Sequence, residues 1–186
     1  MNVGIISERY AKALLKYATE TGNGKKVYEQ AKHLEGCFSS LEGLRLLVRH
    51  PKATSDRYKL RVFVTALGGE TEAAPELVRF LNLVMKNRRI MYVRLMLLIF
   101  MDLYRKANNI SFGRLVVAVP SEQLHRRLTD IVHDETGGSL ELETKVDPSI
   151  IGGFVLDMGW ERLDASVASQ LRAVRRQFVE KNRRIV

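Results

Sequence analysis

The chain has 186 residues, of which 46% are hydrophobic and 27% charged, enough to bury a core in one domain or two small ones. Its longest apolar run, residues 95–101, has seven residues, whereas a membrane-spanning helix needs about 20, so we predict no transmembrane helix. The single cysteine, Cys37, excludes an internal disulfide, and residues 1–10 lack the pattern of a secretory signal, so we expect a cytoplasmic protein.

The formal net charge of +9 lies entirely in the first part of the chain. Residues 1–110 hold 19 Lys and Arg against 10 Asp and Glu, whereas residues 111–186 hold 11 of each. The densest basic cluster has no aromatic RNA-binding motif beside it; it comprises Lys86, Arg88, Arg89 and Arg94. We favour a solvated basic face, and a basic helical nucleic-acid-binding protein remains the alternative.

Residues 5–106 are predicted to form a bundle of successive helices. The breaks fall at residues 22–24, 50–51 and 68–69 and near residue 87. Thr54 or Ser55 is predicted to cap one helix, and Gly68 to end it in the left-handed conformation. The segment MYVRLMLLIFMDLY, residues 91–104, is apolar almost all round, which predicts a fully buried helix at the centre of the bundle.

After residues 108–109 the pattern changes to strands and helices. Residues 113–119, 139–146 and 153–158 are predicted strands. A helix begins at Ser121 and ends at residues 137–138, and its inward side chains are Leu124, Leu128, Ile131 and Val132. A final helix carries an apolar stripe of Val167, Leu171, Val174 and Phe178. The fold class is therefore an N-terminal all-α bundle followed by a small α+β C-terminal domain.

Two helices of the bundle carry more apolar surface than packing requires. At 100° per residue, the apolar side chains of helix 5–20 cover an arc of about 200°, and those of the helix in residues 75–88 about 220°, roughly twice what a bundle helix needs. Because residues 91–104 already take the central position, we predict that the excess forms a groove for an amphipathic helix of another chain.

Catalytic patterns are not evident in the sequence. Gly152-Gly153 fits neither a phosphate loop nor a dinucleotide fingerprint, and we interpret it as a bulge or a point of close helix approach. The four histidines are too far apart for a compact metal site, and Ser166 is placed to cap the last helix. We predict no catalytic, cofactor-binding or metal-binding residues.

Three segments of the chain resemble the δ subunit family of bacterial F-type ATP synthases, the counterpart of the mitochondrial oligomycin-sensitivity-conferral protein. The segments are YAKALLKYA (10–18), RFLNLVMKNRR (79–89) and KVDPSIIGGFVLDMG…LDASVASQL (145–171). The family often has Gly-Asp where this chain has Gly159-Trp160, and Asp-Gly-Ser where it has Asp-Ala-Ser at 164–166. These departures concern only local turn shape.

The resemblance implies a non-catalytic stator subunit that resists rotor torque during proton-driven ATP synthesis. A six-helix domain, residues 1–108, would bind the α subunit of the catalytic head, and an α+β domain, residues 109–186, would bind the b subunits of the peripheral stalk. The complex would lie on the cytoplasmic face of the bacterial inner membrane. The resemblance places the N-terminal helix of an α subunit between the first and fifth helices, against Tyr10, Ala13, Leu14, Tyr17, Phe80, Leu83, Val84 and Asn87.

Overall fold

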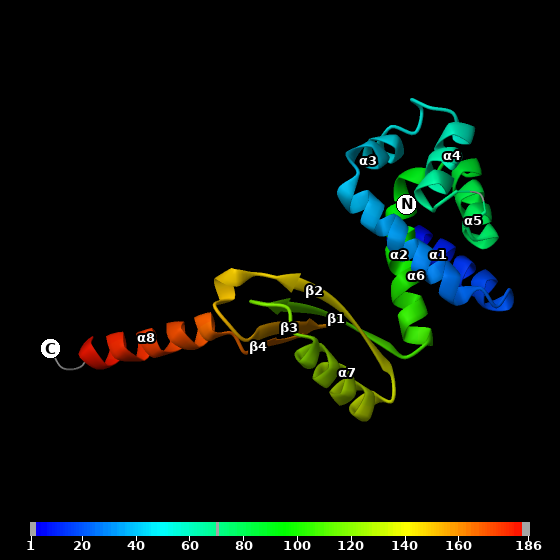
Figure 1. The fold of residues 1–186 in the computed structure, drawn as a ribbon. Helices are drawn as coiled ribbons and strands as arrows, with labels where there is room; N and C mark the ends of the chain where they lie inside the picture. Colours follow the sequence, from blue (N-terminus) through cyan, green and yellow to red (C-terminus); the bar gives the residue numbers. More distant parts are fainter. Residues whose placement is uncertain (1–2, 70, 184–186) are drawn as a thin grey trace. The chain divides into compact units, whose positions relative to one another are not determined.

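The structure is a computed structural model that describes residues 3–69 and 71–183, and it separates into two compact units, Met1–Tyr104 and Arg105–Val186. Helices precede the first strand, as Figure 1 shows. They are α1 (Val3–Glu20), α2 (Gly24–Ser40), α3 (Glu42–Arg49), α4 (Asp56–Ala66), α5 (Pro75–Lys86), the short 3-10 helix η1 (Ile90–Tyr92) and α6 (Val93–Ala107).

Local sequence signals explain where α4 begins and ends. The hydroxyl of Ser55 accepts a hydrogen bond from the Tyr58 N–H, which confirms Ser55 as the cap. Gly68 has φ +96°, and the N–H of Gly69 donates to the Val64 carbonyl at 2.9 Å, so the helix ends in a left-handed turn as predicted.

The core of the first unit is built from side chains of all its α-helices. Phe38, Phe63 and Phe100 are at most 1% exposed, and the rings of Tyr28 and Tyr104 stack with their centroids 4.6 Å apart. The prediction that residues 91–104 form a fully buried helix is wrong. One side of this segment faces solvent, with Met91, Leu95 and Leu98 at 50%, 37% and 41% exposure, because an all-apolar composition does not reveal how many neighbours surround a helix.

The second unit is a four-stranded sheet with helices. In chain order it contains β1 (Ile110–Val117), α7 (Glu122–Thr136), β2 (Ser139–Val146), η2 (Pro148–Ile150), β3 (Phe154–Met158), β4 (Glu161–Asp164) and α8 (Val167–Arg183). The strand order is β2-β1-β3-β4. The parallel strands β1 and β2 are joined through α7, while β3 is antiparallel to both β1 and β4.

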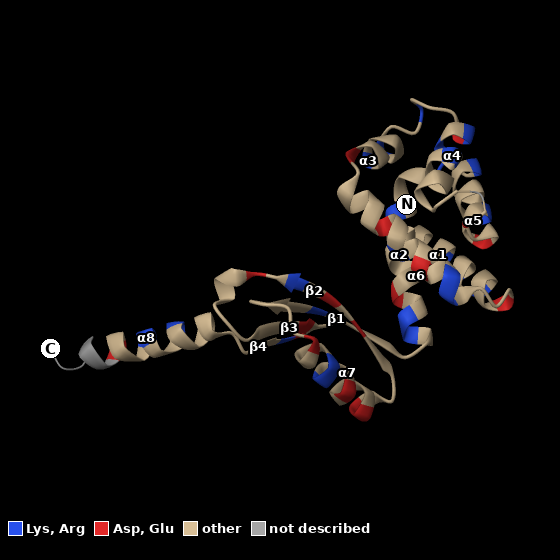
Figure 2. Ribbon diagram, viewed as in Figure 1, with Lys and Arg blue, Asp and Glu red and all other residues tan. Residues whose placement is uncertain are grey.

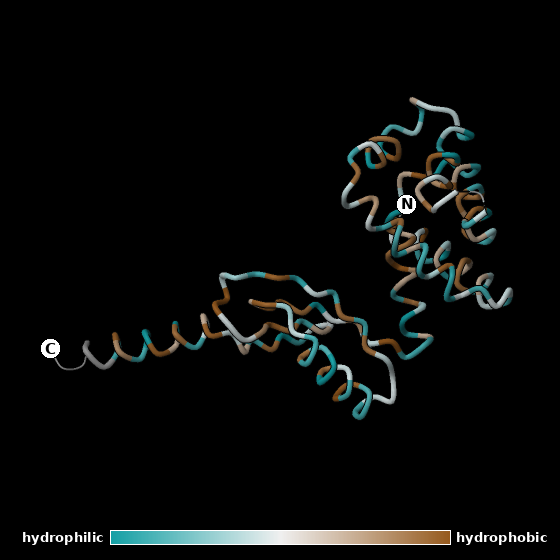
Figure 3. The backbone as a smooth tube through the Cα atoms, in the orientation of Figure 1, coloured by the Kyte–Doolittle hydropathy of each residue, from teal (hydrophilic) through white to brown (hydrophobic). Residues whose placement is uncertain are grey.

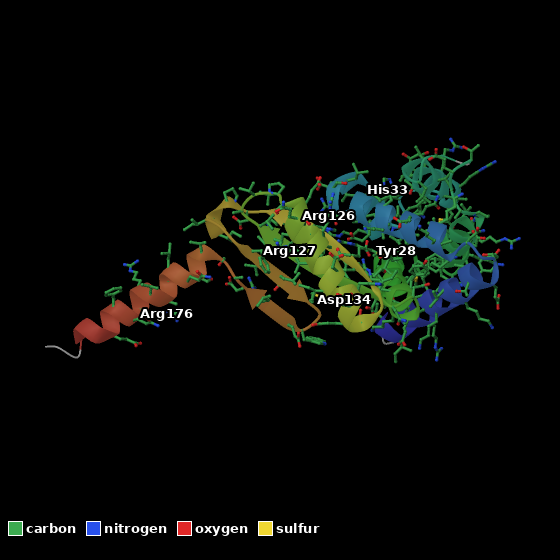
Figure 4. The ribbon with its side chains drawn as sticks, turned by 60° about the horizontal axis from the view of Figure 1, so that its bottom comes forward. Tyr28, His33, Arg126, Arg127, Asp134 and Arg176 are labelled. Atoms are coloured by element: carbon green, nitrogen blue, oxygen red, sulfur yellow. The ribbon has the colours of Figure 1, made fainter. Side chains whose placement is uncertain are left out.

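Helix α7 covers one face of the sheet, where Leu128 packs with Leu115, Val117 and Leu156. Leu128 and Val132 are buried as predicted, but Ile131 is 52% exposed, so its predicted inward position is wrong. Ile131 adjoins the buried stripe without belonging to it, because the sheet contacts a narrow face of the helix. The outer side of α7 carries exposed charged residues such as Arg126, Arg127 and Asp134 (Figure 4).

The opposite face of the sheet carries a row of alternating charges across all four strands. Glu143, Arg114, Asp157 and Arg162 occupy neighbouring register positions. The guanidinium of Arg114 lies 3.4 Å from Glu143, and that of Arg162 lies 3.5 Å from Asp157. Alternating signs stabilise cross-strand neighbours and leave this row without a net charge.

Gly152 and Gly153 allow the segment before α8 to approach β3 closely. Gly153 has φ +74°, and a Cβ there would overlap the carbonyl oxygen of Ala165. The N–H of Val167 donates to the Gly152 carbonyl at 3.0 Å, and that of Ala165 to the Phe154 carbonyl at 2.9 Å. The predicted close approach is confirmed, and the contact shapes the sheet and the start of α8.

Candidate interaction surfaces

Helices α1 and α5 pack against each other in antiparallel orientation. Near one end the Asn87 side-chain amide donates to the Tyr10 hydroxyl at 2.7 Å, and further along α1 the Arg79 guanidinium donates to the Tyr17 hydroxyl at 2.9 Å. The ring of Tyr10 also meets the edge of Phe80, with centroids 6.4 Å apart. The two tyrosines therefore link α1 to α5 along one side of the unit.

The eight residues assigned to the groove by resemblance all lie on α1, α5 or the residue that follows α5, but they differ in exposure. Three belong to the core: Leu14, Phe80 and Val84, at 2%, 6% and 0% exposure. Tyr10 and Tyr17 are half-buried. The surface that remains open consists of Ala13, Leu83 and Asn87, with Leu83 at 47% exposure. The apolar surface that stays exposed is thus narrower than the apolar arcs of the two helices predicted, because α1 and α5 bury much of that surface against each other.

Two basic residues that follow α5 make contacts within the first unit. The Arg89 guanidinium donates to the Tyr10 hydroxyl at 3.2 Å and lies 5.5 Å from the centroid of that ring. Arg94 pairs with Glu35 of α2 at 2.7 Å. Half of the densest basic cluster is therefore engaged within the chain, and Figure 2 shows Lys and Arg interspersed with Asp and Glu along the helices.

The N-terminal end of α5 is tied to the loop after α1. The Asn23 side-chain amide donates to Oε1 of Glu76 at 2.8 Å, and Glu76 is only 2% exposed. Burial acts to raise the pKa of Glu76, but hydrogen bonds from Asn23 and from the residue's own backbone N–H outweigh it and lower the pKa. A carboxylate in the first turn also suits the helix dipole.

Helix α8 presents an apolar stripe that the rest of its unit leaves open. Residues 170–180 are all exposed, including Leu171 at 55%, Val174 at 48% and Phe178 at 65%. At the start of the stripe, Ile151 is 63% exposed and borders a hollow of about 310 Å³ with Ala168 and Leu171. Figure 3 shows these hydrophobic positions alternating with hydrophilic ones along α8.

A network of hydroxyls fixes the start of α8. The Ser166 and Ser169 hydroxyls each donate to the Asp164 carboxylate at 2.6 Å, and the Ser169 N–H donates to the Ser166 hydroxyl. The predicted cap at Ser166 is confirmed. These hydrogen bonds, first those from Ser166 and then those from Ser169, lower the pKa of Asp164 from 3.8 to about 2.

An apolar pocket that the sequence did not indicate lies among α2, α3 and α4. Its volume is about 610 Å³, and Leu44, Leu47 and Val62 contribute to its walls. The exposed side chains Leu41 and Tyr58, each at 52% exposure, stand at this pocket. No sequence pattern marks it, because its walls come from three segments whose spacing is set by packing.

The histidines and carboxylates do not converge within the described residues. Across residues 3–69 and 71–183, no group of three His, Cys, Asp or Glu side chains could hold a metal ion. His33 lies 3.7 Å from Cys37 on the same helix, and His133 meets the Gly138 carbonyl at 3.1 Å. In the part of the chain that the structure describes, no helix is long and apolar enough to cross a membrane.

These features define a protein with an all-α unit and an α+β unit, each of which leaves apolar side chains of a helix exposed. The chain belongs to the ATP synthase delta (OSCP) subunit family, whose model matches residues 6–178. It is 43% identical to "ATP synthase subunit delta" of Phocaeicola vulgatus over the whole of both chains. It is 32% identical to the protein of the same name from Synechococcus sp., over 88% of this chain and 89% of that one.

The fold recurs in a solved structure. A chain of the Toxoplasma gondii mitochondrial ATP synthase hexamer superposes with a TM-score of 0.68 at 23% identity, covering 93% of this chain and 97% of that one. Together with the family, this makes the protein a non-catalytic stator subunit of an ATP synthase.

Proposed function

We propose that the protein connects the catalytic head of the ATP synthase to its peripheral stalk, with one unit for each. Helices α1 to α6 would form the family's six-helix bundle and bind the N-terminal helix of an α subunit. The second unit would bind the b subunits. The assembly would lie on the cytoplasmic face of the bacterial inner membrane. The observation that carries this proposal is that each unit leaves an apolar helix surface open: Ala13 and Leu83 on one, and Leu171, Val174 and Phe178 on the other.

The α1–α5 surface suits an amphipathic helix. Ala13, which is small, and Leu83 are both exposed and form the open strip, and the half-buried rings of Tyr10 and Tyr17 lie on the same side of α1 as Ala13. An incoming helix would place its own apolar residues on this strip, as helix-in-groove ligands do. An interface of standard size, about 800 Å² per partner, is compatible with the slow dissociation that a torque-bearing joint needs.

The test for this surface is Ala13→Asp. A charge in the strip should abolish binding of a synthetic peptide with the α subunit's N-terminal sequence, measured by calorimetry on the full chain. Thr19→Asp is the control, because Thr19 is exposed and lies about 120° away round the same helix. Both variants should keep the far-UV circular dichroism of the wild type. Normal binding by Ala13→Asp would exclude this surface as the site.

The α8 stripe is the corresponding candidate for the b subunits. Leu171, Val174 and Phe178 recur at helical spacing on one side, while Arg176, labelled in Figure 4, lies on the other side at about 140° from Leu171. Arg175 lies about 40° from Leu171 and borders the same hollow. An apolar stripe with a basic residue beside it suits the amphipathic helix of a stalk subunit, because apolar burial stabilises the complex and the charge orients the partner.

Leu171→Asp should therefore prevent recovery of b subunits with the tagged full chain, while α subunits are still recovered. Ala173→Asp introduces the same charge at an exposed position outside the stripe and should leave recovery unchanged. Equal loss of b-subunit recovery in both variants would show that the added negative charge on α8, and not a lost contact with the stripe, prevents binding.

A further inference from the structure

A cavity of about 520 Å³ lies between the turn that precedes α4 and the turn that follows α5. Three cationic side chains from three separate segments line it: Lys52 before α4, Lys59 within α4 and Arg88 after α5. One carboxylate, that of Asp56, faces them. The cavity shares no lining residue with the α1–α5 surface or with α8, so the stator contacts do not account for it.

Lys59 is the most deeply placed of these cations, at 2% exposure. Its ammonium group donates to the Pro51 carbonyl and to the Asp56 carboxylate, the latter at 2.8 Å. An ammonium group has three donors, so one remains for a further acceptor. A buried charge with an unused donor favours an additional anionic partner.

Arg88 reaches the cavity from a backbone conformation that disfavours an arginine. It has φ +55°, in the left-handed region where glycine or asparagine is usual after a helix. Neither Arg88 nor Lys52 has a salt-bridge partner among the described residues, whereas Lys59 is paired with Asp56. The three cations thus outnumber the one carboxylate, and Lys52 and Arg88 are exposed, so their charges are open to an anion in the cavity.

Thr54 adds a neutral hydrogen-bonding group at the edge of the cavity. The residue lines the cavity, and its Oγ1 is inaccessible to solvent and has no hydrogen-bond partner within the described residues. A buried hydroxyl without a partner is uncommon, so this hydroxyl would gain a hydrogen bond if a bound anion reached it. Met85 and Ile90 form an apolar part of the cavity wall.

We propose that this cavity binds a phosphate group. Such a group carries up to two negative charges and several strong acceptor oxygens, which match one ammonium donor, a guanidinium fork, a second lysine and a hydroxyl. Free phosphate and the phosphate of a nucleotide share this chemistry. Binding would neutralise the excess charge and stabilise the folded first unit.

The test is a titration of the full isotope-labelled chain with inorganic phosphate and, separately, with ADP, followed by amide NMR shifts at constant ionic strength. Saturable shifts are expected at Ser55, Lys59 and Arg88. Saturation with inorganic phosphate identifies a free-anion site, and saturation with ADP alone identifies a site for a phosphate carried on a nucleotide. Saturation with neither overturns the proposal.

Arg88→Gly provides the decisive variant, because glycine suits φ +55° and should keep or raise the thermal stability of the fold. Loss of a charge-assisted hydrogen bond should weaken binding about tenfold or more. Arg57→Ala is the matched control, since Arg57 is an exposed cation of α4 that does not line the cavity. Unchanged binding by Arg88→Gly, or equal weakening by both variants, would overturn the proposal.

Discussion

Replacing Gly153 with alanine tests whether the glycine pair exists for close backbone approach. At φ +74° a Cβ introduces left-handed strain of about 1–2 kcal/mol. The same Cβ would overlap the Ala165 carbonyl, so the segment before α8 must move away from β3. That movement would disrupt the hydrogen bonds of Ala165 to Phe154 and of Val167 to Gly152, each worth about 1 kcal/mol. The second unit should lose about 3–4 kcal/mol in total.

Gly159→Ala separates the backbone strain from the steric overlap. Gly159 also has a positive φ, +57°, but a Cβ there meets nothing within 4 Å. Only the strain of about 1–2 kcal/mol should remain. Amide hydrogen exchange in β1 and β3 measures how much stability each variant loses, since a loss of 1.4 kcal/mol speeds exchange through unfolding of the unit about tenfold. Equal effects of the two variants would refute the reasoning that close approach requires the glycine.

Two further predictions concern the first core and the cap of α8. Phe100→Ala should lower the free energy of unfolding of the helical unit by about 3–5 kcal/mol, because Phe100 is fully buried. Leu98 lies on the same helix at 41% exposure, so Leu98→Ala should lower it by less than about 1.5 kcal/mol. Urea unfolding measures both free energies, and similar losses in the two variants would contradict the assigned core. The pKa of Asp164 is lowered from 3.8 to about 2, so its stabilisation is fully present above pH 3.8 and is lost as the pH falls through about 2. Asp164→Asn should remove this pH-dependent stabilisation, which amide hydrogen exchange in the first turn of α8 can measure. If the pH dependence of exchange between pH 2 and 5 were the same in the variant as in the wild type, the assigned role of Asp164 would be wrong.

Local signals in the sequence predicted several boundaries because their causes are local. Ser55 and Ser166 cap helices through hydrogen bonds to residues three positions away, and Gly68 relieves a left-handed turn. Strand β4 escaped prediction because Glu161–Asp164 has four residues and only Leu163 is apolar, so no alternation marks it. Its pairing with β3 arises from the turn at Gly159 and the register of the neighbouring strand.

The partner-binding surfaces also combine features that local sequence predicts with features that packing decides. The wide apolar arcs of α1 and α5 were evident from residue spacing, but spacing could not show that Leu14, Phe80 and Val84 are buried in the core. The contact of Tyr10 with Asn87 joins residues 77 positions apart and leaves no trace in either local pattern. How much of an apolar arc remains open depends on which neighbour covers it.

The sequence by itself determined the order of the strands β1 to β3, most of the helix boundaries, several caps, the change from a helical half to a mixed half and the resemblance to a family. Each of these depends on residues near one another along the chain, where backbone sterics and periodic burial act directly. Only the tertiary structure decided that one side of residues 91–104 faces solvent, that α8 leaves its stripe open and that Lys52, Lys59 and Arg88 meet at one cavity. These depend on packing between distant segments, which sequence spacing does not encode.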